Sequence, residues 1–247
     1  MGSWLQWIVD MHNEQREGGQ SGTLYIVSTP IGNLDDITRR SLETLNRVGL
    51  IAAEDTRRTR ILLKHYSIQT PLSSYNSYNQ AKKGKQFITR LLQGEDLALV
   101  SDAGTPGISD PLYHLVRAAL DAKITVISTP GPSALLGALT VSGLPVDRFV
   151  FEGFLPRKKG RKRLIEELAE EKRTIVLFES PHRIEKTLIE LSKTLGNRPA
   201  ALARELTKVY EEVIRGTLQD LASIAGERKL KGEITLVISG RPRKKEK

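Results

Sequence analysis

The feature that most constrains the fold of this 247-residue chain is a regular alternation between two kinds of segment. Short runs of apolar and β-branched residues are typical of buried strands, and the longer stretches between them repeat apolar residues at helical spacing. In the first half, the expected strands are residues 24–28, 49–53, 97–101 and 124–128, and the expected helices are residues 38–48, 57–66, 80–92 and 112–121. The alternation predicts an α/β domain with a largely parallel sheet and helices on both faces.

The pattern changes near Pro145, after a helix that Ser133 opens and that Gly143 and Pro145 end. Strands are expected again at residues 149–154, 174–178, 200–203 and 234–238, with helices at residues 161–171, 184–195 and 218–225. We therefore expect two α/β domains, with an extension before them and a basic tail after them. The predicted ranges are 1–21 for the extension, 22–145 and 146–240 for the domains, and 241–247 for the tail.

The net charge of +9 is distributed unevenly along the chain. Residues 1–146 contain 14 Lys and Arg against 13 Asp and Glu, whereas residues 147–247 contain 24 against 16. This asymmetry favours a polyanionic partner for the second half, nucleic acid before membrane. The alternative is plain solubility or a basic tail, because residues 241–247 alone carry five positive charges.

Composition also excludes several classes of protein. The chain has no cysteine, so disulfides, thiolate zinc sites and cysteine nucleophiles are excluded, and a reducing cytoplasm fits. The four histidines are scattered without a helical i, i+4 pair, so no metal site is predicted. The apolar run at residues 4–9 is too short for a membrane span, and Asp10 follows it directly.

Three loops follow expected strands of the first half. In residues 29–38, Pro30 and Gly32 bend the chain, and Asp35 or Asp36 can cap the next helix. Residues 102–111 place Asp102 at a strand tip, with two glycines after it that let a ligand approach the backbone. Residues 129–134 lead into the helix N-terminus at Ser133, which favours an anion.

Ligands of open α/β sheets bind at the carboxyl ends of the strands, so these loops are expected to converge on one ligand with sugar, amine and carboxylate groups. Each loop taken alone is equally consistent with a tight strand-to-helix turn. Neither a GxGxxG nor a GxxxxGK[ST] motif occurs, so nicotinamide dinucleotides and a P-loop lose support.

Four further segments mix acidic and basic residues directly beside expected strands: residues 54–59, 179–183, 204–208 and 231–233. Each is either a salt-bridged helix start or part of a site. For residues 54–59 the structural interpretation is a helix capped by Asp55 or Thr56. The functional interpretation is an acid and arginines at a strand tip, facing a nucleic-acid phosphate or an acceptor hydroxyl.

Taken in order, residues 24–38, 54–59, 100–111 and 130–134 resemble the tetrapyrrole (corrin/porphyrin) methylase family. Residues 153–158, 178–183, 203–208 and 231–235 resemble one branch of it, bacterial enzymes that methylate the 2′-hydroxyl of a cytidine in the decoding region of 16S ribosomal RNA. The resemblance covers about residues 22–240 and is silent on the N-terminal extension.

The resemblance implies a class III methyltransferase fold, in which two α/β domains hold S-adenosylmethionine (SAM) in the cleft between them. It also implies a homodimer that acts in the cytoplasm on 16S rRNA of the small ribosomal subunit, without a membrane. By motif position, the expected SAM contacts in this sequence are Pro30, Ile31, Gly32, Asp102, Gly104, Thr105, Ser133, Ala134, Phe178, Ala203, Glu233 and Ile234.

A ribose 2′-hydroxyl is a poor nucleophile, so a base or an electrostatic partner for the developing alkoxide would help the reaction. The candidates are Asp55, Glu179, His182, Arg204 and Glu205, and among them an imidazole has the most suitable ordinary pKa. His182 follows Pro181 at a helix start, so capping or packing is its alternative role. Phosphate contacts are expected from Arg57, Arg58, Arg157, Lys158, Lys159, Arg161, Lys162 and Arg163.

Two rival functions stay open on the sequence. The same fold and loops serve small-molecule methylases that act on an acidic tetrapyrrole, and a basic site suits either substrate. The other rival is a non-catalytic RNA-binding or assembly factor that has kept the fold, although the intact Asp-Ala-Gly-Thr-Pro loop at residues 102–106 argues against it.

Overall fold

The structure is a computed structural model that describes residues 21–108 and 113–242. The predicted N-terminal extension and basic tail lie outside these residues, apart from Ser21, Arg241 and Pro242. The chain divides into two compact units, one of Met1–Pro30 with Leu34–Pro132 and the other of Ile31–Asn33 with Ser133–Lys247. No helix in the described part of the chain is both long and apolar enough to span a bilayer.

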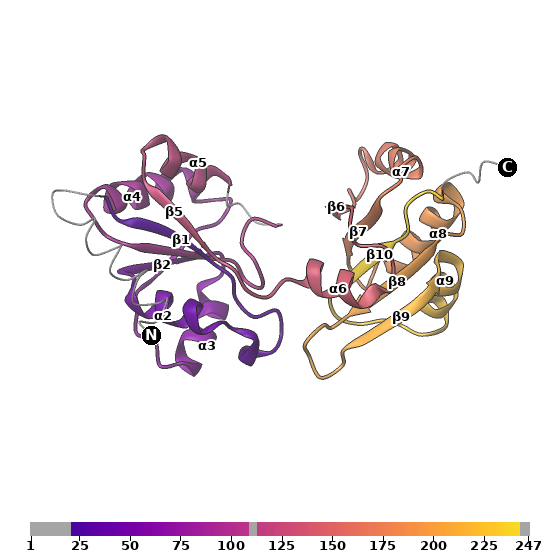
Figure 1. Cartoon of the computed structure of the whole chain (residues 1–247), viewed down its shortest axis with the longest axis horizontal. Helices are drawn as coiled ribbons and strands as arrows, with labels where there is room; N and C mark the ends of the chain where they lie inside the picture. Colours follow the sequence, from indigo (N-terminus) through magenta and orange to yellow (C-terminus); the bar gives the residue numbers. More distant parts are fainter. Residues whose placement is uncertain (1–20, 109–112, 243–247) are drawn as a thin grey trace. The chain divides into compact units, whose positions relative to one another are not determined.

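The first unit is built on a five-stranded sheet in the order β3-β2-β4-β1-β5, and every strand pair in it is parallel (Figure 1). This confirms the parallel sheet predicted from the alternating pattern. The strands are β1 (Thr23–Val27), β2 (Leu50–Ala53), β3 (Leu72–Ser74), β4 (Leu97–Val100) and β5 (Thr125–Thr129).

Helices cover both faces of this sheet, because successive residues of each buried strand point to opposite sides. Leu24 and Ile26 pack with the apolar residues of α4 (Gln80–Leu92) and α5 (Tyr113–Asp121). Tyr25 and Val27 pack with those of α2 (Arg39–Arg47) and α3 (Thr56–His65) on the other face (Figure 1). Both layers of helices were expected from the sequence.

The helix caps of this unit differ in part from the prediction. Thr38 caps α2 by accepting a hydrogen bond from the N–H of Ser41, whereas Asp35 and Asp36 fall in a short 3-10 turn, Leu34–Asp36. The prediction that Asp35 or Asp36 caps this helix was therefore wrong, because the turn separates them from it. Asp55 does cap α3, through the N–H of Arg57.

The second unit contains a mixed five-stranded sheet in the order β6-β7-β10-β8-β9 (Figure 1). Only the β6–β7 pair is parallel, and the other three pairs are antiparallel. The strands are β6 (Phe149–Phe154), β7 (Thr174–Glu179), β8 (Pro199–Arg204), β9 (Glu212–Thr217) and β10 (Ile234–Ile238). This unit is α/β as expected, although the pattern alone did not reveal β9.

Helices also lie on both faces of the second sheet. One face packs against α7 (Arg161–Ala169), α8 (Ile184–Leu195) and α9 (Leu218–Glu227), and the other against α6 (Ala134–Ser142). Leu135 and Leu139 of α6 pack against Val176 and Val237 of the sheet. The chain therefore divides between Pro132 and Ser133, thirteen residues before the predicted boundary at 145, because α6 shares its core with the second sheet.

Candidate functional site

The loops after β1, β4 and β5 are hydrogen-bonded to one another in the first unit. Thr29 and Gly104 exchange two backbone hydrogen bonds of 2.9 Å each. The Ser28 hydroxyl donates to Thr105 Oγ1 (3.1 Å), and the Thr105 hydroxyl donates to the carbonyl of Pro132 (3.2 Å). Gly104 has a φ of +77°, in the left-handed region that glycine adopts without strain. The loops predicted to converge therefore do meet.

The strand order explains why the loops meet at this place. β4 and β1 are neighbours, yet the chain leaves β1 towards β2 and leaves β4 towards β5, on opposite sides of the pair. Such a switch point opens a crevice beside the carboxyl ends of the two strands, where α/β sheets bind their ligands. Ser28, Thr29, Ser101 and Asp102 stand directly after these two strands.

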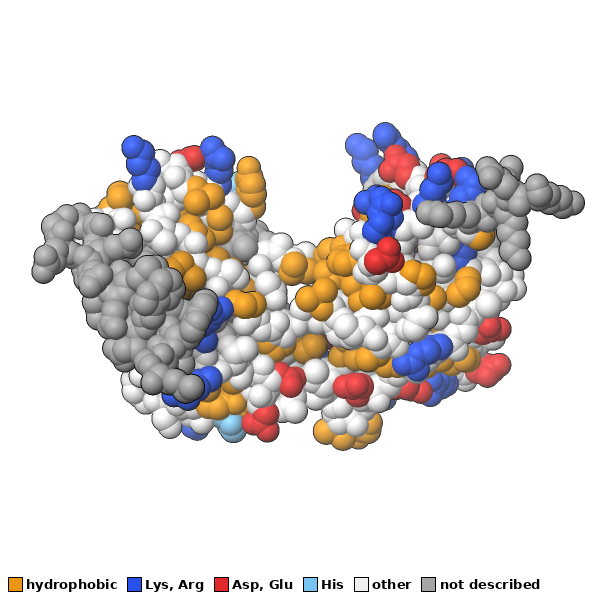
Figure 2. Space-filling view, in the orientation of Figure 1, with side chains coloured by type: hydrophobic (Ala, Val, Ile, Leu, Met, Phe, Trp, Pro, Cys, Tyr) orange, Lys and Arg blue, Asp and Glu red, His pale blue; other side chains and the backbone are white. Residues whose placement is uncertain are grey.

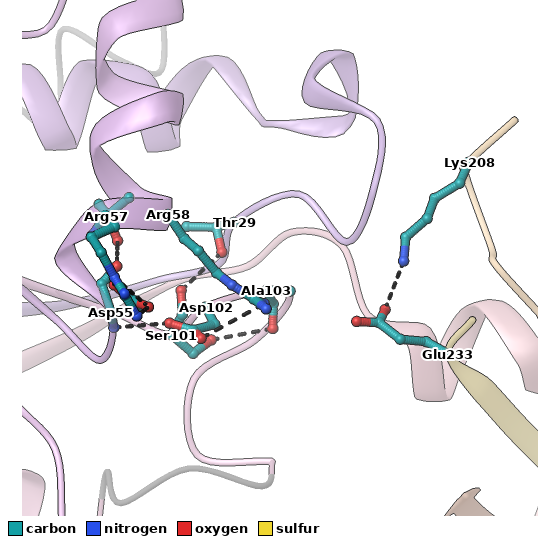
Figure 3. Close-up of polar contacts among 10 residues, drawn as sticks. Thr29, Asp55, Arg57, Arg58, Ser101, Asp102, Ala103, Lys208 and Glu233 are labelled. Carbon is teal, nitrogen blue, oxygen red and sulfur yellow. Dashed lines mark hydrogen bonds and ion pairs between the residues drawn. The ribbon is translucent and has the colours of Figure 1, made fainter. Parts of the chain in front are cut away.

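Asp102 is the carboxylate at this switch point (Figure 3). Its Oδ1 accepts a hydrogen bond from the N–H of Asp55 (2.9 Å), and its Oδ2 lies 3.7 Å from Nη1 of Arg58. The side chain is 29% exposed. A carboxylate can accept about four hydrogen bonds, so Asp102 keeps acceptor capacity for a hydroxyl or amine of a ligand.

Asp55 and Arg57 form a second pair beside Asp102 (Figure 3). Arg57 Nη2 lies 2.6 Å from Asp55 Oδ2, and the Arg57 N–H also donates to this carboxylate. The hydrogen bond from the Arg57 guanidinium, followed by the one from its backbone, lowers the pKa of Asp55 to about 2. A carboxylate with so low a pKa is a weak base near neutral pH, so its contacts favour capping α3 over proton transfer.

In the second unit, Phe178 and Ala203 lie in one row across the sheet, because both are paired with Thr235 of β10. They belong to the face that α6 covers, where Ala203 is buried and Phe178 is half-buried. The ring of Phe178 contacts those of Phe151 and Phe154, with centroid distances of 4.9 and 5.7 Å. Two predicted SAM contacts are thus placed together beside an aromatic cluster.

Lys208 contacts several of the remaining residues that the sequence predicted for the site. Its ammonium donates to Glu205 Oε1 (2.9 Å) and to Glu233 Oε2 (3.0 Å), the latter drawn in Figure 3. The hydrogen bond from Lys208 lowers the pKa of Glu205. Gly32 passes so close to Lys208 that a Cβ there would collide with the lysine side chain, which explains the glycine.

The other second-unit candidates are helix-start or core residues. Ser133 caps α6, with its hydroxyl oxygen accepting from the N–H of Leu136, and Ala134 is the first residue of this helix. The side chain of Ile234 is buried in the apolar core, so only its backbone can reach a ligand. No group of three or more His, Asp or Glu in residues 21–108 and 113–242 could hold a metal ion.

Comparison with known proteins decides the family. Residues 23–222 match the model of the tetrapyrrole (corrin/porphyrin) methylases. The chain belongs to the tetrapyrrole methylase family. It is 49% identical over 234 residues to the ribosomal RNA small subunit methyltransferase I of Halalkalibacterium halodurans, covering 94% of this chain and 80% of that protein. It is 50% identical over 220 residues to the same-named protein of Thermotoga maritima, covering 89% and 99%.

Solved structures give the same fold at much lower identity. A cobalt precorrin-4 methyltransferase of cobalamin biosynthesis aligns with a TM-score of 0.67 at 17% identity, covering 88% of this chain and 94% of that one. A uroporphyrin-III C-methyltransferase of Thermus thermophilus, complexed with S-adenosyl homocysteine, aligns with a TM-score of 0.63 at 17% identity, covering 88% and 97%. The tetrapyrrole methylase fold predicted from the motifs is confirmed.

Within this tetrapyrrole methylase, Glu179 lies in a different environment from the one a catalytic base requires. Its side chain is only 1% exposed and is buried beside the α7–α8 face of the second sheet, opposite Phe178. It accepts hydrogen bonds from the hydroxyl of Thr187 (2.7 Å) and from Nη2 of Arg183 (3.1 Å). These contacts make Glu179 the centre of a buried ion-pair network.

The structure separates the predicted phosphate-binding residues of segment 157–163 into three groups. Arg161 is 12% exposed and bonds to Glu190 (2.8 Å) and to the hydroxyl of Thr187 (2.9 Å), so it supports the network around Glu179. Lys162 and Arg163 are exposed and paired one turn along α7 with Glu166 and Glu167. The exposed side chains without a partner among the described residues are those of Arg157, Lys158 and Lys159.

The last two catalytic candidates differ in accessibility. Arg204 is held by the carbonyls of Lys231 (3.0 Å) and Tyr210 (3.2 Å) and by Glu212. His182 is exposed, and it lines an open groove of the second unit together with Arg157. His182 is therefore the candidate whose side chain is free to meet a substrate.

Sequence reasoning missed two residues that the structure makes prominent. Lys208 lies inside a polar segment that the pattern singled out, but only the fold brings it to both Glu205 and Glu233. Phe154 ends the expected strand 149–154 and is 56% exposed. An exposed aromatic residue at a strand end is the signal that could have marked it.

Proposed function

We propose that this protein is a SAM-dependent methyltransferase that methylates the ribose 2′-hydroxyl of a cytidine in the decoding region of 16S ribosomal RNA. The observation that carries the proposal is identity of 45% to 52%, over 89% to 94% of the chain, to relatives named ribosomal RNA small subunit methyltransferase I. The small ribosomal subunit is then the partner and the cytoplasm the location. A homodimer is proposed from the family resemblance, and sedimentation would test it.

The residues of the first unit suit SAM by their chemistry. The partly exposed carboxylate of Asp102 can accept hydrogen bonds from ribose hydroxyls or from an ammonium group, and Thr105 offers a hydroxyl beside it. The further SAM contacts proposed from resemblance are Pro30, Ile31, Gly32, Gly104, Ser133, Ala134, Phe178, Ala203, Glu233 and Ile234. When bound, SAM supplies an electrophilic methyl group.

The contribution of the protein side chains is then positioning, water exclusion and charge stabilisation. A ribose hydroxyl must be aligned at near-contact distance, and such alignment can supply roughly 7–11 kcal/mol of a reaction barrier. Asp55 and Glu205 have lowered pKa values and Glu179 is buried in ion pairs, which leaves His182 as the accessible proton acceptor among the candidates. Arg57 and Arg58, in the first turn of α3, are proposed to hold phosphates.

The rival substrate is an acidic tetrapyrrole, the class of compound after which two solved proteins of this fold, the cobalt precorrin-4 methyltransferase and the uroporphyrin-III C-methyltransferase, are named. Those proteins are 17% identical to this chain, so the similarity shows a shared fold but gives no information about the substrate. The +8 balance of residues 147–247 suits either polyanion, and the 45% to 52% identity favours RNA. A non-catalytic RNA-binding factor is the third possibility, and the intact switch-point loop with Asp102 opposes it.

The deciding experiment offers methyl-labelled SAM with either undermethylated small ribosomal subunits or a uroporphyrinogen-type substrate. We expect label in 16S RNA, resistant to alkaline cleavage at one cytidine because its 2′-hydroxyl is blocked. Label in the tetrapyrrole alone would replace the proposal by its rival. Bound SAM with label in neither substrate would favour the non-catalytic factor.

The role of Asp102 can be tested by calorimetry with SAM. Asp102→Asn removes the negative charge but keeps an oxygen that can accept the hydrogen bond from Asp55. We expect SAM affinity to fall by roughly tenfold or more, because charge-assisted hydrogen bonds contribute about 1.5–3 kcal/mol. Asp121→Asn, which breaks a surface pair with Arg117 on α5, is the matched control. Equal SAM affinity in the two variants would remove Asp102 from the site.

A further inference from the structure

A basic groove of about 750 Å³ lies entirely within the second unit, between the end of β6 and the start of α8. Its lining combines one exposed aromatic ring, that of Phe154, with an imidazole, that of His182, and four cationic side chains, those of Arg157, Arg161, Arg183 and Lys186. Figure 2 shows apolar and basic side chains next to one another on this unit, in the region where Figure 1 places β6. No carboxylate lines the groove, although Glu179 and Glu190 stand behind it.

Two of the arginines, Arg161 and Arg183, are held in place by hydrogen bonds to groups behind the groove. Arg161 bonds to Glu190 and to the hydroxyl of Thr187. Arg183 donates through Nη2 to the carbonyl of Leu155 (2.7 Å) and to Glu179 (3.1 Å). Its Nη1 and Nε donate to none of the described residues, so part of the guanidinium remains available to a ligand. An arginine held in this way binds an anion with little further loss of side-chain entropy.

The other cations are exposed at the rim. Arg157 has no partner for its side chain among the described residues, and Lys186 reaches Glu190 only at 4.0 Å with 81% of its side chain exposed. The four cations of the groove outnumber the two carboxylates behind it. The groove therefore keeps a net positive charge, which suits a phosphate.

Phe154 adds a recognition surface that a simple anion does not need. Its ring is 56% exposed, and its centroid lies 5.7 Å from that of Phe178, which supports it from one side. Single-stranded RNA is bound by this combination, with bases stacked on aromatic rings and phosphates held by cations. An acidic peptide would use the cations but would gain little from an exposed ring.

We propose that this groove binds a nucleotide of the RNA substrate that neighbours the methylated one, with its base against Phe154 and its phosphate against Arg157, Arg183 and Lys186. The inference rests on the proposed function, because Phe178, which touches Phe154, is one of the proposed SAM contacts. The groove then orients the RNA chain so that the adjacent ribose reaches the methyl donor.

The test measures binding of a fluorescein-labelled single-stranded RNA fragment of the decoding region by fluorescence anisotropy at several salt concentrations. Phe154→Leu should weaken binding about tenfold with an unchanged salt dependence, since stacking is not ionic. Arg157→Gln with Lys186→Gln should make the plot of log affinity against log salt less steep by up to about 0.7, the value for one phosphate of a single strand. Phe154→Tyr should bind as the wild type does, because it keeps the ring.

Matched controls lie on the same elements. Phe149→Leu changes the other end of β6, and Lys193→Gln neutralises a lysine about two turns further along α8. Both should leave RNA binding unchanged, and melting temperatures show whether each variant is folded. Methyl transfer to small subunits by the wild type, with unaltered RNA affinity in the groove variants, would overturn this inference alone. Absence of methyl transfer to any RNA by the wild type would overturn the proposed function and the groove together.

Discussion

Phe178 and Glu179 are adjacent on β7, and the pleat of the strand gives them opposite surroundings. Phe178 lies on the α6 face with Val176 and Ala203, whereas Glu179 is buried beside α7 and α8. A carboxylate with 1% exposure that holds two arginines cannot also meet a ribose on the other face of the sheet. At the scale of single residues, side-chain direction thus separates Glu179, which has a structural role, from Phe178, a proposed SAM contact.

The ion-pair role of Glu179 predicts a loss of stability on substitution. In Glu179→Gln, Arg161 and Arg183 keep their charges with one carboxylate fewer, and breaking such a buried pair costs about 3 kcal/mol. We expect the free energy of unfolding in urea to fall by about that amount. Glu190→Gln, at a residue whose side chain is 34% exposed, should cost less than about 1 kcal/mol. Full stability combined with lost methyl transfer would instead make Glu179 a catalytic residue.

The lowered pKa of Asp55 gives a pH dependence with a definite sign. The folded value of about 2 lies below the ordinary value of 3.8, so the Asp55 carboxylate stabilises the fold above pH 4. This contribution is lost as the pH falls from about 4 to 2. Asn also caps helices well, so Asp55→Asn should keep α3 and lose less stability than the wild type over that interval. Urea midpoints at pH 5, 4, 3 and 2 measure the difference; parallel curves would refute it.

At the scale of elements, most of the runs that predicted strands correctly are buried on both faces, such as 97–101 and 234–238. The edge strands β5 and β6 were also predicted, because their sequences are runs of apolar and β-branched residues. The two strands that the pattern did not reveal, β3 and β9, are edge strands with a single neighbour each. β3 is Leu-Ser-Ser, and β9 carries Glu212 and Arg215, so neither has a buried apolar run. An edge strand needs only one apolar face and a partner for its backbone, and the partner is not visible in the local sequence.

The basic segment 157–163 was predicted as one RNA-binding unit, and the structure divides it at Gly160, where α7 begins. We expect Lys158→Gln, Lys159→Gln and Lys162→Gln together to weaken RNA binding and its salt dependence, with unchanged melting temperature and SAM affinity. Arg161→Gln should instead lower the melting temperature by several degrees, because it removes a partner of Glu179 and Glu190. Anisotropy, calorimetry and thermal melting of both variants test whether Arg161 is structural while the lysines of the segment bind RNA. Equal melting temperatures of the two variants would contradict this assignment.

At the scale of the whole molecule, the sequence predicted the switch-point loops of the first unit well, because Asp102 and Thr105 directly follow a strongly apolar strand. It predicted the second unit less completely. The convergence of Lys208 on Glu205 and Glu233 depends on the pairing of β8 with β10, which joins residues about 30 positions apart. Such antiparallel pairing leaves no local pattern, whereas a strand followed by its own loop does.

The position of the division between the units can be tested with fragments. A fragment of residues 133–242 contains β6 to β10 with α6, whereas a fragment of residues 146–242, starting at the predicted boundary, lacks this helix. Leu135 and Leu139 are buried against the second sheet, and each contributes about 1.5–3 kcal/mol by burial. Their loss takes roughly 3–6 kcal/mol from a domain whose total stability is about 5–15 kcal/mol.

We therefore expect the longer fragment to melt cooperatively, and the shorter one to expose the apolar face of Val176 and Val237 and to bind a hydrophobic dye. The substitution Leu139→Asp in the longer fragment should reproduce the behaviour of the shorter one, because it opposes α6 packing without shortening the chain. Neither fragment includes Ile31–Asn33, so the comparison isolates the helix. Cooperative melting of both fragments, with similar midpoints, would show that α6 does not belong to the core of the second unit and would restore the boundary near residue 145.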